Sequence, residues 1–180
     1  MLYLQKILDG FIYKRGRKSP LFIKKNMTIS KKKVIKLAQE RIDELNSGCY
    51  LVDVIINRGN NIIVEIDNKN SGVAINDIVS VSRNIEHNLD RENEDFKLDV
   101  TSPGLDKPFK VLNQYHKNIN KTVKVIYDTG KILEGILTEV NKENIFIETK
   151  EIVKENKKKI TKYNKEVISH KSIKQTKLIF

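Results

Sequence analysis

A short run of turn-forming residues divides this chain into two parts and limits how it can fold. In residues 98–108, Leu-Asp-Val-Thr-Ser-Pro-Gly-Leu-Asp-Lys-Pro, a strand-like segment runs directly into turn chemistry. Pro103 suits the second position of a type II turn because its ring fixes φ at about −65°, and Gly104 suits the third, which needs a positive φ. Asp106 and Pro108 then oppose continuation of the strand. We therefore predict a hinge between two domains at this run.

The distribution of charge supports two domains. The chain has 180 residues and a net charge of +11, but residues 1–33 carry ten basic groups against one acid, residues 34–106 seven against fourteen, and residues 107–180 seventeen against eight. A phosphate backbone would repel the middle part and attract the two flanks, so we expect nucleic acid to meet the flanks. The alternative is that part of the lysine content is compositional background, and that residues 157–159, three lysines, form a solvated loop.

The single cysteine and the hydropathy pattern indicate a cytoplasmic protein. Cys49 has no second cysteine in the chain to form an intramolecular disulfide. The sequence contains no apolar run near the ~20 residues that cross a bilayer. Residues 1–10 include Lys6 and Asp9 and lack a signal-peptide cleavage site, so we expect neither a secretory signal nor a membrane anchor.

The first 26 residues differ in pattern from the rest of the chain. They are basic and show no sustained periodicity, whereas Met27, a second possible initiator, immediately precedes a helix signal. We interpret residues 1–26 as a disordered basic tail or a mis-assigned translational start. The predicted domains are then residues 27–107 and 108–180.

Residues 27–107 have the pattern of a two-layer α+β domain in which helices cover one face of a sheet. Ser30 suits the N-cap of a helix that Gly48 ends, and Asn76 suits the N-cap of a second helix with Asp77 in its first turn. The expected elements, in order, are a helix at 30–46, a hairpin of strands at 50–57 and 62–67, a helix from 76 to about 89, and a strand at 96–101. The hairpin should place Val52, Val54 and Ile56 on the same face as Ile62, Val64 and Ile66.

Residues 108–180 have the pattern of a small β-barrel. After a short helix near residues 112–117, the expected strands are 122–127, 132–140, 144–150, 166–169 and 174–179. Gly135 falls in mid-strand, where a missing side chain permits the bend that closes such a barrel. Residues 151–163 contain five lysines and few apolar positions, so we expect an expanded, solvated loop there.

The sequence offers no catalytic or metal-binding pattern, so we predict a non-enzyme without cofactors. His87, His116 and His170 have no partners at ligand spacing. Ser102 is a conceivable nucleophile, but the sequence nominates no base for it. Residues 30–106 also lack the Gly-x-x-Gly clamp through which KH domains hold nucleic acid.

Two segments resemble the RimP family of bacterial ribosome maturation factors. They are the Ser-Pro-Gly-Leu-Asp-Lys-Pro run of the hinge and the step Val81-Ser82-Arg83, which follows an acidic helix start. The resemblance extends over roughly residues 30–180, and it departs from the family pattern at residues 118–120 and in the lysine-rich segment.

The resemblance implies a fold and a function. The expected fold is an N-terminal KH-like α+β domain followed by an Sm-like, SH3-type barrel. The expected function is a non-enzymatic assembly factor required for maturation of the small (30S) ribosomal subunit, which binds immature subunits through ribosomal protein and 16S rRNA. We expect a cytoplasmic monomer without a membrane or small-molecule partner. The alternative is a free-standing Sm-like RNA-binding module, which would bind naked single-stranded RNA tightly and with a steep salt dependence.

The candidate binding residues lie at the hinge and on the second predicted helix. They are Arg83, Ser102, Pro103, Gly104, Leu105, Asp106, Lys107, Pro108 and Lys110. If the hinge folds back over that helix, Arg83, Lys107 and Lys110 form a basic cluster at the domain junction. The alternative for Arg83 is an ion pair with Glu86 on its own helix.

Overall fold

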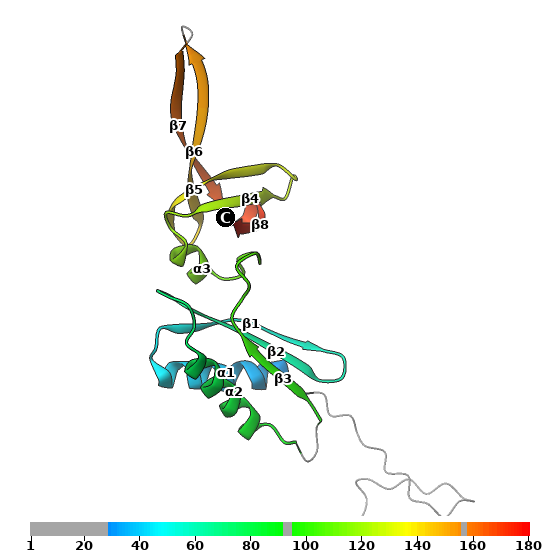
Figure 1. The fold of residues 1–180 in the computed structure, drawn as a ribbon. Helices are drawn as coiled ribbons and strands as arrows, with labels where there is room; N and C mark the ends of the chain where they lie inside the picture. The colour runs from blue at the N-terminus through cyan, green and yellow to red at the C-terminus, as the bar shows by residue number, and fades with distance from the viewer. Residues whose placement is uncertain (1–28, 92–94, 156–157) are drawn as a thin grey trace, which may run out of the picture.

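The chain forms an α+β structure with two separate sheets, joined by the segment that follows residue 101 (Figure 1). The computed structural model describes residues 29–91, 95–155 and 158–180. The predicted basic tail, residues 1–26, lies outside the described residues. No helix in the described part of the chain is long and apolar enough to cross a membrane.

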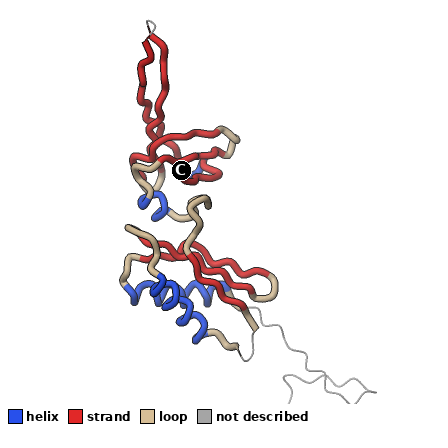
Figure 2. Tube along the Cα trace, viewed as in Figure 1, coloured by secondary structure: helices blue, strands red, loops and turns tan. Residues whose placement is uncertain are grey.

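The elements follow the predicted order along the chain (Figure 2). The helices are α1 (Lys31–Leu45), α2 (Ile75–Asn88) and α3 (Leu112–Lys117), with a 3₁₀ turn at His170–Ser172. The strands are β1 (Cys49–Asn57), β2 (Asn61–Asn68), β3 (Lys97–Thr101), β4 (Thr122–Tyr127), β5 (Ile132–Val140), β6 (Asn144–Glu155), β7 (Lys158–Ser169) and β8 (Ile173–Leu178).

The first unit is a three-stranded sheet covered on one face by α1 and α2 (Figure 1). β1 and β2 form the predicted hairpin, and β3 adds to β2 in parallel. Ser30 is the N-cap of α1 as predicted, but its side chain makes no capping hydrogen bond. The predicted stop at Gly48 is wrong, because Asn46, at φ 46°, ends the helix. The predicted cap at Asn76 is wrong, because α2 begins at Ile75.

A β-bulge changes the predicted facing of the hairpin. The register shifts between Leu51 and Asp53, so Leu51, not Val52, lies opposite Ile66 and packs against the helices. Val54 and Ile56 face the core as predicted. On the opposite face, the shift places Asp53 opposite Glu65 and leaves Tyr50 opposite Asp67. Asp53, Glu65 and Asp67 thus share the face of the sheet that the helices do not cover, and the bulge adds Tyr50 to it.

The second unit is a five-stranded antiparallel sheet in the order β7-β6-β5-β4-β8. Its core contains Val123, Val125, Leu137, Ile145 and Ile147, which are fully buried. The prediction of a barrel is wrong in one respect: among the described residues β7 and β8 are the two edges, and the sheet is not closed.

The predicted solvated loop at residues 151–163 is also wrong. Residues 151–155 and 158–163 form the outer halves of β6 and β7, whose ladder continues to the pair Glu155 and Lys158. The two strands project from the sheet as a ribbon, which we call the arm (Figure 1). The segment is rich in lysine but also contains β-branched residues such as Val153 and Ile160, which favour strand pairing.

Gly135 lies where β5 meets β6 most closely. A Cβ atom at this position would lie 2.5 Å from the carbonyl oxygen of Glu148 and 2.6 Å from Cγ2 of Ile147. A backbone oxygen cannot swing away as a flexible side chain would, so only glycine fits here. The glycine predicted to permit a bend therefore permits this close approach between strands.

We expect Gly135→Ala to lower the free energy of unfolding by about 1–3 kcal/mol, because the added methyl group overpacks the sheet. Urea denaturation followed by circular dichroism measures this. The matched control is Gly72→Ala, where an added Cβ would meet nothing within 4 Å, and it should change stability by less than about 0.5 kcal/mol. Equal effects of the two substitutions would contradict this account of Gly135.

Candidate binding site at the junction of the two sheets

The predicted hinge is an exposed loop, which we call the junction loop (residues 102–107). It contains a turn closed by a hydrogen bond of 3.0 Å from the Lys107 amide to the Gly104 carbonyl. The predicted type II turn, with Gly104 at positive φ, is wrong, because the turn lies two residues later and Gly104 does not have a positive φ. Leu105 therefore occupies the turn, where 69% of its surface is exposed.

The chain is anchored to the second unit immediately after this loop. The amide of Phe109 donates a hydrogen bond of 2.8 Å to the carbonyl of Thr176 on β8. The Phe109 ring meets the ring of Tyr115 on α3 edge to face, with centroids 5.0 Å apart, and Tyr115 in turn contacts His170. These contacts hold the backbone from which the side chains of Lys110 and Lys117 extend.

Lys110 reaches from this anchor back to the first unit. Its ammonium lies 2.8 Å from Oδ2 of Asp53 and 2.7 Å from Oε2 of Glu65. The hydrogen bond from Lys110 holds the pKa of Asp53 below its usual range. Partial burial lowers the pKa of Lys110, but the two carboxylates outweigh it and raise that pKa overall. One ammonium group thus serves two acids that the pairing of β1 with β2 places side by side.

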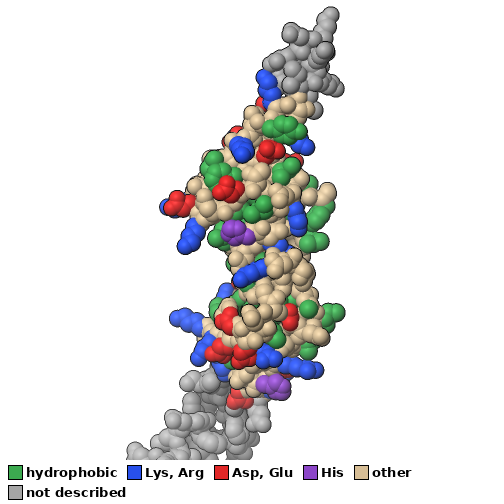
Figure 3. Space-filling view, turned by 90° about the vertical axis from the view of Figure 1, so that its left-hand side faces the viewer, with side chains coloured by type: hydrophobic (Ala, Val, Ile, Leu, Met, Phe, Trp, Pro, Cys, Tyr) green, Lys and Arg blue, Asp and Glu red, His purple; other side chains and the backbone are tan. Residues whose placement is uncertain are grey.

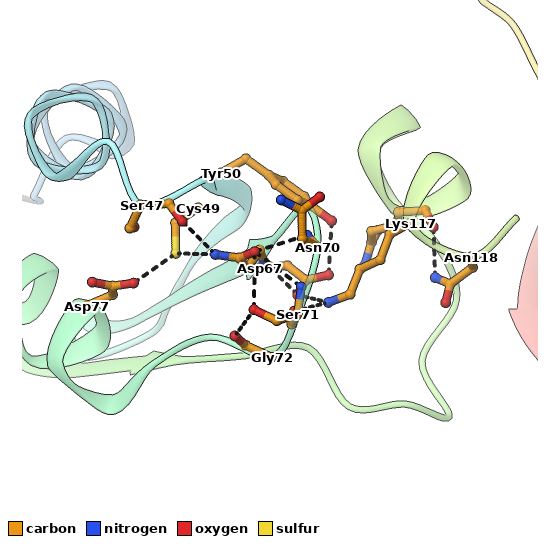
Figure 4. Close-up of polar contacts among 12 residues, drawn as sticks. Ser47, Cys49, Tyr50, Asp67, Asn70, Ser71, Gly72, Asp77, Lys117 and Asn118 are labelled. Atoms are coloured by element: carbon orange, nitrogen blue, oxygen red, sulfur yellow. Dashed lines mark hydrogen bonds and ion pairs between the residues drawn. The ribbon is translucent and has the colours of Figure 1, made fainter.

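Lys117, at the end of α3, makes a second link of the same kind (Figure 4). Its ammonium donates hydrogen bonds of 2.6 Å to Oδ1 of Asp67 and 2.8 Å to the carbonyl of Ser71. The other oxygen of Asp67 accepts a bond of 2.9 Å from the Tyr50 hydroxyl. Burial, together with the Asp67 carboxylate, raises the pKa of Tyr50 well above its usual range. We call the two links, Lys110 with Asp53 and Glu65 and Lys117 with Asp67, the lysine clasp.

The structure does not bring Arg83 into this junction. Arg83 lies on α2 and lines a shallow groove between the two helices together with Arg41 and His87. Lys110 binds the opposite face of the sheet, so the predicted cluster of Arg83, Lys107 and Lys110 does not form there. The alternative partner of Arg83, Glu86, pairs instead with Arg91.

The remaining candidates lie in or beside the junction loop. Ser102, Gly104, Leu105, Asp106 and Lys107 are exposed, and Pro103 and Pro108 are half-buried. Among the described residues, no group of three or more His, Cys, Asp or Glu side chains is placed to hold a metal ion.

Sequence reasoning missed the acidic half of the clasp. Glu65 and Asp67 alternate with Val64 and Ile66 along β2, which is a detectable signal of acids on the outer face of a sheet. Their lysine partners lie 45 and 50 residues further along the chain, and no local pattern connects them.

Comparison with known proteins gives consistent matches. The family model "RimP N-terminal domain" matches residues 37–106. The ribosome maturation factor RimP of Flavobacterium psychrophilum is 38% identical over 151 residues, which cover 83% of this chain and 96% of that protein. The same factor from Christiangramia forsetii is 44% identical over 108 residues, or 60% of this chain and 69% of that protein. The Porphyromonas gingivalis factor is 36% identical over 127 residues, or 70% and 81%.

We expect Lys117→Met to lower the free energy of unfolding by about 2 kcal/mol, because it leaves the buried Asp67 carboxylate without its cation. Chemical denaturation measures this. In the control Lys124→Met, the lost partner is Glu134, half of whose side chain is exposed, so the change should stay within about 0.5 kcal/mol. A loss at Lys117 no larger than that at Lys124 would show that the clasp does not stabilise the fold.

Proposed function

The chain belongs to the RimP family and acts in ribosome assembly, and from this premise we propose that it binds immature small (30S) ribosomal subunits and promotes their maturation without catalysing a reaction. The match to the Flavobacterium psychrophilum factor over 96% of its length carries this proposal. The partner we propose is the precursor particle, contacted through ribosomal protein and 16S rRNA, and the site of action is the cytoplasm.

The two units suit two kinds of contact within one particle. Residues 34–106 have twice as many acidic as basic groups, whereas residues 107–180 have seventeen basic groups against eight acids. We propose that the acidic unit faces basic ribosomal protein surfaces, and that the basic unit and the junction loop contact ribosomal protein and adjacent rRNA. Figure 3 shows acidic side chains on the first unit, which is the lower one in that view.

The finer fold assignment is part of the same proposal. Two hydrophobic cores, one beneath each sheet, support a division into a KH-like domain at residues 27–107 and an Sm-like domain at 108–180. An Sm-like domain here would be an open variant, with its edges at β7 and β8. We expect the chain to act as a monomer.

The junction loop is the contact site that we propose. Its residues Ser102, Pro103, Gly104, Leu105, Asp106 and Lys107 are candidates from the sequence, as are Pro108, Lys110 and Arg83. In the structure Lys110 has a role within the clasp, whereas Leu105 is a large apolar side chain displayed to solvent between the two units. A large apolar side chain exposed on a loop suits burial at a protein interface, with the adjacent exposed Lys107 at its polar edge.

Sedimentation tests the function directly. We expect the full-length chain to sediment with immature small subunits in preference to mature subunits and naked rRNA, and to do so at physiological salt. Equal binding to all three that disappears with salt would mean a generic polycation, and would favour a free-standing RNA-binding module.

In the same assay, Leu105→Ser should weaken binding to immature subunits at least severalfold, since removing an exposed leucine side chain from water on binding is worth on the order of 1–3 kcal/mol. Stability should not change, because Leu105 is exposed. The control is Ile132→Ser, which removes an apolar side chain of 52% exposure from β5. If Leu105→Ser and Ile132→Ser bind alike, the junction loop is not the contact.

A further inference from the structure

The arm leaves the second sheet as a two-stranded ribbon. The ladder between β5 and β6 reaches only as far as the pair Ile136 and Glu148, whereas β6 and β7 remain paired from Asn144 to Glu155. Beyond Glu148, neither side of the ribbon is covered by a third strand of this sheet. On this part of the arm, the side chains of Lys150 and Tyr163 are exposed.

The register of the ribbon places aromatic, apolar and basic side chains on one face. Directly paired residues of antiparallel strands point to the same face, and the successive pairs are Phe146 with Val167, Glu148 with Lys165, and Lys150 with Tyr163. The intervening residues Ile145, Ile147 and Ile168 are buried in the core on the other side. We call the six paired residues the arm face.

Tyr163 and Val167 are exposed far more than apolar side chains of a sheet normally are, at 58% and 60%. The Lys150 ammonium lies 5.8 Å from the centre of the Tyr163 ring, on the exposed surface. Phe146 is half-buried at the base of the arm. Figure 3 shows hydrophobic side chains and lysines side by side on the upper unit, below the grey tip.

We propose that the arm face binds single-stranded RNA, with Tyr163 and Phe146 stacking on bases and Lys150 and Lys165 meeting phosphates. Aromatic rings on a sheet surface with adjacent cations are the features by which proteins hold single strands without sequence preference. The sequence that joins β6 to β7 is basic, since residues 154–159 contain four lysines and one glutamate.

A protein partner fits this face less well. The apolar groups form no continuous patch, because the pair Glu148 and Lys165 separates Tyr163 from Val167. Those two side chains lie four residues apart on β7, roughly 13 Å along the strand. A protein interface needs a contiguous desolvated centre, whereas single bases can stack on isolated rings.

The arm face also contains one group that opposes RNA. The Glu148 carboxylate lies between the two aromatic positions, opposite Lys165. This carboxylate should repel phosphate. Replacing it with a neutral side chain should therefore strengthen RNA binding, whereas loss of the Tyr163 ring should weaken it.

The test is fluorescence anisotropy of the full-length chain with a labelled, unstructured RNA strand of about 12 nucleotides. Tyr163→Val keeps strand propensity but removes the ring, and should weaken binding roughly 5- to 100-fold, while Tyr163→Phe should bind as the unaltered chain does. Phe180→Ala, which removes an aromatic ring of 84% exposure at the C-terminus, is the matched control and should have little effect.

The charged positions give two further readouts. Lys150→Gln and Lys165→Gln should each reduce the slope of log affinity against log salt by about 0.7. Glu148→Gln should tighten binding by about twofold. Binding that is unchanged in Tyr163→Val, or weakened equally by Phe180→Ala, would overturn the proposal, as would weaker binding in Glu148→Gln.

The inference rests on the proposed function for the source of the RNA, which would be unpaired rRNA in the precursor particle. The two claims fail separately. If the chain sediments with immature subunits but its RNA affinity does not depend on Tyr163, only the arm proposal is wrong. If RNA affinity depends on Tyr163 but the chain shows no preference for immature subunits, the maturation function is wrong and the arm proposal holds.

Discussion

The lysine clasp determines how the two units of this chain face each other. Lys110 and Lys117 reach from the start of the second unit to Asp53, Glu65 and Asp67 on the uncovered face of the first sheet. Charged groups that are partly buried cost free energy unless they are paired. The acids of this face and the two lysines therefore stabilise each other only when the two units lie in this relative arrangement. That arrangement leaves the junction loop exposed between the units and the groove between α1 and α2 on the far side.

One partner of the clasp, the Tyr50 hydroxyl that donates to Asp67, depends in turn on a single irregularity in β1. Without the bulge at Val52, the positions before it would be displaced by one residue relative to β2, and a shift of one residue turns every side chain to the other face. Asp53 would still lie opposite Glu65, but Tyr50 would no longer lie opposite Asp67 on the uncovered face. The sequence does predict most helices and strands, because periodic patterns such as Ile78, Val81 and Ile85 in α2 depend only on neighbouring residues.

Features that depend on distant residues cannot be predicted in the same way. The bulge, the clasp and the open edge of the second sheet arise from contacts between segments many residues apart. The predicted turn falls two residues too early because Pro-Gly is a strong local signal, yet Gly104 does not use its freedom to adopt a positive φ. The arm is predicted to be a loop because its many lysines outweigh the strand-forming residues that lie between them in the sequence. The family resemblance, by contrast, depends on short motifs and is supported by relatives over most of their length.

The most direct test of this account measures the distance between the two units in solution. Spin labels on cysteines introduced at the exposed residues Lys36 and Lys131 would report it by double electron–electron resonance, since the natural Cys49 is buried. The account predicts one narrow distance distribution in the otherwise unaltered chain and a clearly broader one when Lys110→Met and Lys117→Met are combined. Distributions of equal width would show that the clasp does not hold the two units together.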